Sequence, residues 1–216
     1  MKSIFLIFLF SILTAAAQNN KHEFVGLVKF AHTVVATDKD YNPDNDYAAI
    51  GRHSDYYFKD GDIKWLTYDS YFRMDLFRAK ENRDYYLTNR SDSIFTPKNN
   101  DRDFDIISYN VLKSDRVILG HKCRMVELKL KPLGRETPVT YRRYYFSSDF
   151  YIDPEKLAKC TSSGYDVIYG QMKSIPLRIE FEFPGRTVVW EATEIKPMNL
   201  ETSFFELAKG TPVWSW

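Results

Sequence analysis

The sequence has 216 residues, of which 44% are hydrophobic and 27% charged, the balance of a folded globular protein rather than a disordered or fibrous one. Thirty basic residues against 29 acidic ones leave a net charge of +1. This near-neutral balance, without a basic stripe, argues against nucleic acid as a partner and against polybasic adhesion to a membrane.

The first seventeen residues have the pattern of a secretory signal peptide. Lys2 precedes an apolar run over residues 4–13, and Ala15 and Ala17 give the small residues that signal peptidase requires before Gln18. The apolar run is too short to cross a membrane, which needs about 20 residues, and no later stretch is long enough. We therefore expect residues 1–17 to be removed. Residues 18–216 should form a single exported domain, periplasmic or secreted, without an integral membrane segment.

Most of the remaining chain shows the period-two alternation of half-buried antiparallel strands. The strands expected in chain order are 24–35, 56–58, 63–65, 71–76, 84–88, 93–96, 104–112, 116–119, 126–130, 139–146, 177–183, 188–192 and 194–197. Asp60-Gly61 and Pro184-Gly185 predict two tight turns between neighbouring strands.

Signals for helices are few. Asp153 is a good N-cap with Pro154 at the first helical position, inside an irregular stretch that covers residues 147–174. A second irregular stretch, 37–46, is polar and contains a proline. Because long helices do not alternate with the strands, the sequence predicts a mainly β protein rather than a parallel α/β fold.

The two cysteines, Cys123 and Cys160, form an even pair in a chain that we expect to be exported. Oxidising compartments favour a disulfide between them, and two buried free thiols are the alternative. His121 lies close to Cys123, but no further cysteine or histidine completes a metal-ligand set. We expect no metal and no cofactor.

The known catalytic patterns that we tested do not fit. The chain has no G-x-S-x-G elbow and no phosphate-binding loop, and His22-Glu23 lacks the second histidine of a zinc-protease helix. The stretch 38–42 begins like a calcium loop, but Pro43 replaces the glycine and Ala49 the glutamate that such a loop needs. Since no nucleophile with a base can be named, we expect a protein that is not an enzyme.

Aromatic residues make up 16% of the chain and lie on both faces of several expected strands. One interpretation is a thick aromatic core with tyrosines at its rim. The other is a cavity between a curved sheet and its covering loops, lined with rings for an apolar ligand.

The chain resembles a group of exported Bacteroidota proteins of unknown function whose fold is similar to that of the periplasmic lipoprotein carriers and lipoprotein receptors of the lipoprotein localisation pathway. The resemblance rests on short elements at residues 58–65, 118–123, 141–146, 175–179 and 205–210. In that group the last element usually reads Phe-x-Leu-Pro, so Ala208 is a departure. The resemblance implies a single, strongly curved antiparallel half-barrel, with one or two short helices covering a concave face that holds acyl chains in the carriers.

Two functions from different classes follow, with a hydrolase as a distant third. The chain is either a carrier or binding protein for a lipid or other apolar small molecule, or an interaction module that meets a partner protein of the envelope through an aromatic surface. For the first function, strand alternation predicts a cavity beneath residues 147–174. The residues expected in its walls are Phe72, Met74, Tyr144, Phe146, Ile179 and Phe181.

Overall fold

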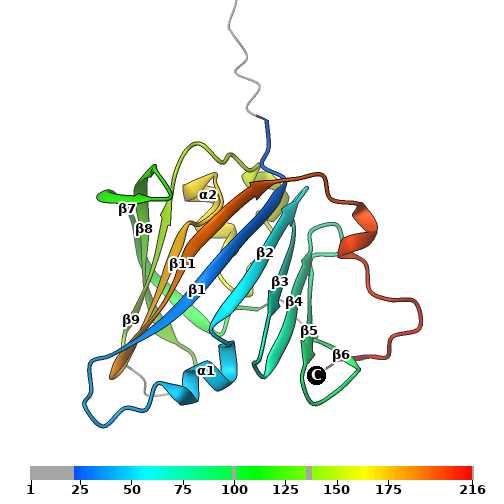
Figure 1. The fold of residues 1–216 in the computed structure, drawn as a ribbon, viewed down its shortest axis with the longest axis horizontal. Coiled ribbons are helices and arrows are strands. Elements are labelled where there is room, and N and C mark those ends of the chain that lie inside the picture. The colour runs from blue at the N-terminus through cyan, green and yellow to red at the C-terminus, as the bar shows by residue number, and fades with distance from the viewer. Residues whose placement is uncertain (1–21, 99–100, 135–137, 216) are drawn as a thin grey trace, which may run out of the picture.

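Twelve β-strands in one sheet organise the part of the chain that the computed structural model describes, residues 22–98, 101–134 and 138–215 (Figure 1). The expectation of a mainly β fold with few helices is confirmed. The expected signal peptide, residues 1–17, lies outside the described residues.

The described chain contains four long strands, eight shorter ones and four short helices. The strands are β1 (Gly26–Ala36), β2 (His53–Lys59), β3 (Asp62–Thr67), β4 (Phe72–Arg78), β5 (Arg83–Thr88), β6 (Ile94–Thr96), β7 (Phe104–Ile118), β8 (His121–Pro132), β9 (Thr140–Phe146), β10 (Arg178–Phe183), β11 (Arg186–Pro197) and β12 (Val213–Ser215). The α-helices are α1 (Asp44–Ile50) and α2 (Tyr165–Met172), and the 3-10 helices are η1 (Pro154–Leu157) and η2 (Thr202–Phe205).

The strand order is β12-β6-β5-β4-β3-β2-β1-β11-β10-β9-β8-β7, so β1 joins two runs of sequential neighbours. All neighbouring strands are antiparallel except β12, which pairs with β6 in parallel. The expectation of a purely antiparallel sheet is therefore wrong at this edge. The chain returns to β6 from the far end of the sequence rather than through a hairpin, so antiparallel pairing is not imposed. β7 and β12 are the two edges, and the sheet is not closed into a barrel.

Two turns formed as the sequence predicts. Asp60 and Gly61 both have positive φ, 52° and 85°, and connect β2 to β3 in a two-residue hairpin in which Lys59 pairs with Asp62. Positive φ at both central residues is the signature of a type I′ turn, which explains the Asp-Gly pair. The Pro184-Gly185 turn likewise connects β10 to β11.

Apolar side chains gather on both faces of the sheet. The main core lies on one face, where Phe30, Tyr56 and Leu128 pack with Leu157 of η1 and Ile168 of α2. The hydroxyl groups of Tyr56 and Tyr169 are hydrogen-bonded, which ties α2 directly to β2.

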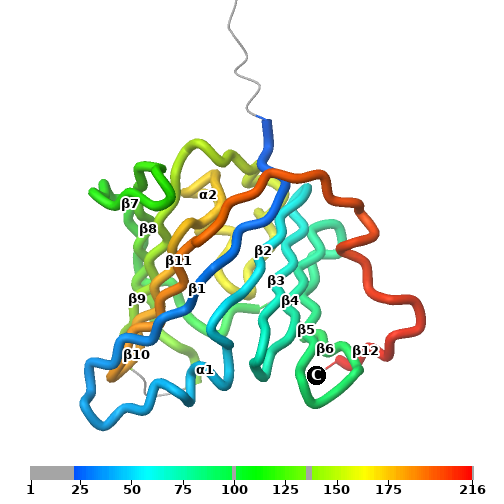
Figure 2. Tube along the Cα trace, in the orientation of Figure 1, coloured from blue at the N-terminus to red at the C-terminus, as the bar shows by residue number. Residues whose placement is uncertain are grey.

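The second core lies on the opposite face of β3–β5. Leu76 and Tyr85 pack there against Leu200 and Phe205 from the segment after β11. Lys64 Nζ donates to Phe204 O at 2.6 Å and fixes this segment to β3. Figure 2 shows the segment in red, running from the end of β11 down the side of the sheet to β12.

The helices differ most from the sequence-based expectations. Asp153 does cap a helix, because its Oδ1 accepts from Glu155 N at 3.1 Å, but that helix is the 3-10 turn η1. The helices α1 and α2 were not predicted. α1 has no buried residue, so it lacks the apolar periodicity by which a helix is recognised in a sequence.

Candidate functional site

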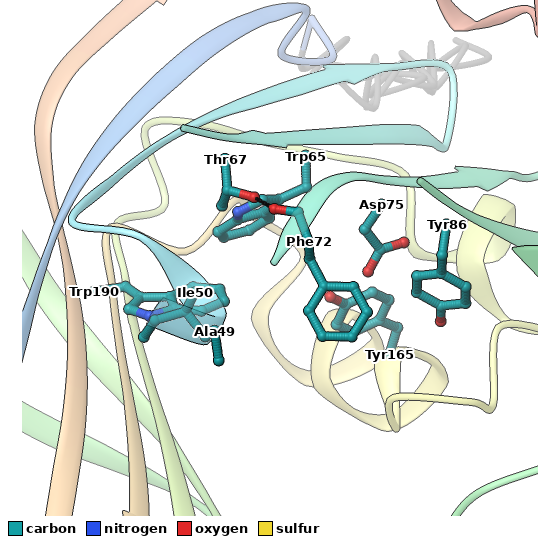
Figure 3. Close-up of a pocket in the computed structure, with 9 residues that line it drawn as sticks. All are labelled: Ala49, Ile50, Trp65, Thr67, Phe72, Asp75, Tyr86, Tyr165 and Trp190. Carbon is teal, nitrogen blue, oxygen red and sulfur yellow. Dashed lines mark hydrogen bonds between the residues drawn. The ribbon is translucent and has the colours of Figure 1, made fainter. Parts of the chain in front are cut away.

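An aromatic cavity of about 190 Å³ lies where β3, β4, β5 and β11 meet α1 and α2 (Figure 3). Five of its nine lining residues carry aromatic rings. The lining consists of Ala49, Ile50, Trp65, Thr67, Phe72, Asp75, Tyr86, Tyr165 and Trp190. We call this space the aromatic cavity.

The register of the sheet places the cavity's central residues side by side. Trp65 of β3 pairs with Asp75 of β4, and Asp75 pairs with Tyr86 of β5. Side chains directly opposite in an antiparallel pair lie on the same face, with Cβ atoms about 4.5–5.5 Å apart. These three residues therefore form one row across three strands. The Trp190 ring of β11 extends the wall, with its centroid 4.6 Å from that of Trp65.

A β-bulge brings Phe72 into the same wall. In regular alternation Phe72 would lie on the face of Met74, which belongs to the second core. The register between β4 and β5 shifts between these two residues, and Phe72 lines the cavity with Asp75 instead. Thr67 Oγ1 donates to Phe72 O and holds the bulge against β3. The Phe72 side chain is 44% exposed, so it stands at the cavity mouth.

Two indole N–H groups in the cavity wall have no acceptor. Trp65 Nε1 and Trp190 Nε1 are buried and make no hydrogen bond with the described residues. Trp65 as a whole is only 7% exposed. A buried donor without a partner costs about 1–3 kcal/mol, and buried tryptophans usually find one. Both N–H groups stay without a hydrogen bond to the described residues, and both belong to residues that line one cavity.

Asp75 is the one carboxyl group in the cavity lining. It has no hydrogen bond and no ion pair with the described residues. Burial, and then the nearby charge of Asp84, raise the pKa of the Asp75 carboxyl well above its ordinary value. Asp75 is half-buried and borders the cavity.

Asp84 lies beside this row but not in the lining. It belongs to β5, is buried, and accepts a hydrogen bond from Ser162 Oγ at 2.6 Å. Burial raises the pKa of Asp84 as well, while the bond from Ser162 lowers it. Because Ser162 stabilises the charged form of Asp84, a proton shared by the two acids lies preferentially on Asp75.

His32 supports the wall from behind Trp190. Its Nδ1 lies 3.0 Å from Gly51 O and its Nε2 2.8 Å from Ser54 Oγ. Burial lowers the pKa of His32 to about 4, so the ring is neutral, with Nδ1–H donating to Gly51 and Nε2 accepting from Ser54. Gly51 ends α1 with φ +72°, and a Cβ there would lie 2.5 Å from Tyr68 O. His32 therefore holds the end of α1, from which Ala49 and Ile50 reach the cavity.

No protein-family model matches the chain, and no curated protein does. The interpretation of the site therefore depends on its own geometry. Among residues 22–98, 101–134 and 138–215, no three His, Cys, Asp or Glu side chains gather as a metal site. In the same ranges no helix has the length and apolar character to cross a membrane.

Of the six side chains expected in a ligand cavity, only Phe72 lines the aromatic cavity. Tyr144, Phe146 and Ile179 fill the main core, and Met74 lies in the second core on the other face. Phe181 contacts the Trp190 ring, with centroids 5.0 Å apart, and lines a separate groove.

Strand alternation did not predict five residues of the lining: Trp65, Asp75, Tyr86, Tyr165 and Trp190. Strand alternation did place Asp75 and Met74 on opposite faces, but it took the face of Asp75 for the solvated one. β4 has a core on both faces, which alternation alone cannot show. The pairing of Asp75 with Trp65 is the signal that would have marked the site.

The expected disulfide is wrong for this structure, in which both cysteines are free and buried. The two thiols have different surroundings. Cys123 Sγ donates to His121 O at 3.5 Å, near the start of β8. Cys160 lies close to the acidic pair of β4 and β5, and burial raises the pKa of its thiol. The even cysteine count favoured a bond, but a count does not show whether the geometry that a disulfide needs is present.

Proposed function

We propose that the chain is a non-enzymatic binding protein that takes a small apolar or amphipathic molecule into the aromatic cavity. The observation that carries this proposal is the pair of buried indole donors, Trp65 Nε1 and Trp190 Nε1, that lack an acceptor among the described residues. A ligand oxygen that accepts from either group would remove the cost of leaving it unbonded. The rings around it would gain about 0.8 kcal/mol for each CH₂ that the ligand removes from water.

The lining supports binding rather than catalysis. Its hydroxyl-bearing aliphatic residue is Thr67, whose Oγ1 donates to Phe72 O and has no base beside it. Concave, mostly apolar sites with a few polar groups are the usual form of small-molecule sites. The cavity has the volume of about six water molecules at roughly 30 Å³ each. We therefore propose a short or ring-shaped ligand in place of a full acyl chain.

The proposal includes the arrangement that the sequence resemblance implies. In it the sheet is a strongly curved half-barrel, as in the lipoprotein carriers, with α2 and η1 against its concave face. The protein acts outside the cytoplasm, after removal of residues 1–17. The contact of Tyr169 with Tyr56 and the burial of Leu157 support the position of the two helices.

The test is a titration with 2-phenylethanol, a neutral ligand with one ring and one oxygen, followed by calorimetry and tryptophan fluorescence. Ala49→Phe would fill the cavity from α1, whereas Ala48→Phe adds the same ring at an exposed position of the same helix that does not line it. We expect saturable binding to the natural protein and to Ala48→Phe, and its loss in Ala49→Phe. Absence of binding to the natural protein, or equal binding by both variants, would reject the cavity as the site.

One observation favours the alternative, an interaction module of the envelope. β7 is a fifteen-residue edge strand that exposes Ile107, Tyr109 and Leu112. Exposed apolar edges are where a strand of another protein can add to a sheet. Under this alternative, Leu112→Lys would abolish capture of a stoichiometric envelope protein, while binding in the aromatic cavity would stay unchanged.

A further inference from the structure

Asp75 receives no hydrogen bond from any donor of the described residues. The row across β3, β4 and β5 places it between the rings of Trp65 and Tyr86, and Figure 3 shows its carboxyl group among Phe72, Tyr86 and Tyr165. Carboxyl groups in such surroundings are normally paired, because an isolated buried charge is costly. A ligand that carries a donor can supply this partner.

Every titratable group that faces Asp75 is acidic or neutral. Asp84 and Tyr86 come from β5, Tyr165 from α2, and the Cys160 thiol from the loop between η1 and α2. None of the ion pairs of the described residues includes Asp75 or Asp84, although fifteen ion pairs are formed elsewhere. The position therefore attracts positive charge and repels anions.

The aromatic rings add a second preference for positive charge. Trp65, Trp190, Phe72, Tyr86 and Tyr165 line the same space, and the face of an aromatic ring attracts a cation within about 6 Å. Rings around a carboxylate are the arrangement by which proteins recognise ammonium groups. The indole N–H of Trp65, a residue more than nine-tenths buried, is a second polar group of the lining that has no partner among the described residues.

We propose that the aromatic cavity binds a small organic ammonium ion, with Asp75 accepting its N–H donors and the aromatic rings lying against its charge. The ligand's other end carries an oxygen that accepts from Trp65 Nε1 or Trp190 Nε1. This inference rests on the proposed function and names its ligand class. A bare metal ion does not fit, because the described residues bring no three metal ligands together.

Binding of the cation is coupled to release of a proton. In the free protein, burial and Asp84 favour the neutral carboxylic acid at Asp75. The ammonium ion favours the carboxylate, so the Asp75 proton passes to the buffer as the ion pair forms, and no covalent bond is made or broken in the ligand. Affinity for an amine should therefore rise with pH until the carboxyl group of the free protein is ionised.

The first experiment compares three ligands of one shape by calorimetry: 2-phenylethylamine, 2-phenylethanol and phenylacetate. We expect the amine to bind at least about tenfold more tightly than the alcohol, because a hydrogen bond to a charged group is stronger than one between neutral groups. Phenylacetate should bind least tightly of the three. Calorimetry in buffers of different ionisation enthalpy should show proton release with the amine and none with the alcohol. If the alcohol binds and the amine binds no better, this inference is wrong while the proposed function stands. If none of the three ligands binds, both this inference and the proposed function are wrong.

The second experiment assigns the effect to Asp75. Asp75→Asn keeps the size of the side chain but cannot form the ion pair, so it should lose the preference for the amine over the alcohol. Asp84→Asn is the matched control on the neighbouring strand, because Asp84 does not line the cavity. Asp84→Asn should keep the preference for the amine. It should move the proton release to lower pH, because the substitution removes the negative charge beside Asp75. Retention of the preference in Asp75→Asn, with both variants folded by circular dichroism, would overturn the assignment.

Discussion

The imidazole of His32 stacks on the indole of Trp190, with ring centroids 4.8 Å apart and an interplanar angle of 22°. The Nδ1–H group of the same imidazole donates a hydrogen bond to Gly51 O at the end of α1. One neutral histidine thus fixes both a wall ring of the aromatic cavity and the helix end beside it. Anything that charges His32 disturbs the two together.

The first prediction concerns stability below pH 6.5. The unfolded chain protonates His32 near pH 6.5 and the folded protein only near pH 4, so the unfolded state binds more protons between these values. The stability contributed by neutral His32 is complete above pH 6.5 and is lost as the pH falls to 4, by up to about 3 kcal/mol. Urea unfolding at several pH values should show this loss. His32→Phe should lack it, whereas His22→Gln, at an exposed position, should retain it.

The second prediction concerns Asp75 and has the opposite sign. Its pKa is raised on folding, so the folded state holds more protons than the unfolded state from about pH 4 upward. Stability should therefore fall as the pH rises through this window. Asp75→Asn has no carboxyl group to ionise, so it should not lose stability in this way. In denaturant titrations, its free energy of unfolding relative to that of the natural protein should increase from pH 4 to pH 8. Asp69→Asn, at an exposed turn, should show the same dependence of stability on pH as the natural protein. If Asp75→Asn also shows that dependence, the pH effect does not come from Asp75.

The third prediction concerns the bond between Tyr56 and Tyr169. Tyr169→Phe leaves the Tyr56 hydroxyl buried without this partner and should lower the free energy of unfolding by about 1–3 kcal/mol. The double variant Tyr56→Phe/Tyr169→Phe leaves no orphaned hydroxyl, so its loss should be smaller than the sum of the two single losses. A strictly additive cycle, measured by urea unfolding, would show that the two groups do not interact.

The fourth prediction concerns the thiols. Because Cys123 and Cys160 are free and buried, the native protein should react slowly with an alkylating reagent. Burial raises the pKa of both thiols and further reduces the reactive thiolate. After unfolding without a reductant, mass spectrometry should find two alkyl groups on each chain. A mass without alkyl groups would mean that the two cysteines form a disulfide.

Much of the sheet followed from local sequence, because hairpins depend on neighbouring residues. Asp60-Gly61 fixed the turn between β2 and β3, and alternation over residues 177–183 located β10. The helix α2 did not follow, because it begins after Gly164 in a left-handed conformation and without a side-chain cap.

The residues of the candidate site could not be predicted from local sequence patterns, for a different reason. Its row of Trp65, Asp75 and Tyr86 depends on register between three strands, and the place of Phe72 depends on a bulge that no residue type announces. Trp190 arrives from β11, far along the chain. Alternation assumes that only one face of a strand is covered, whereas β4 is covered on both faces.

The position of β1 sets the order in which the protein can fold. β1 precedes both runs of hairpins in the chain, yet it pairs with β2 on one side and with β11 on the other, so that Val28 meets both Tyr56 and Ile195. Each run can form from local contacts, but their union waits for the last long strand to be synthesised. Until then β1 has one open side, and Trp190 has not reached Trp65. We expect the cavity to be the last part of the molecule to take shape, after both halves of the sheet exist.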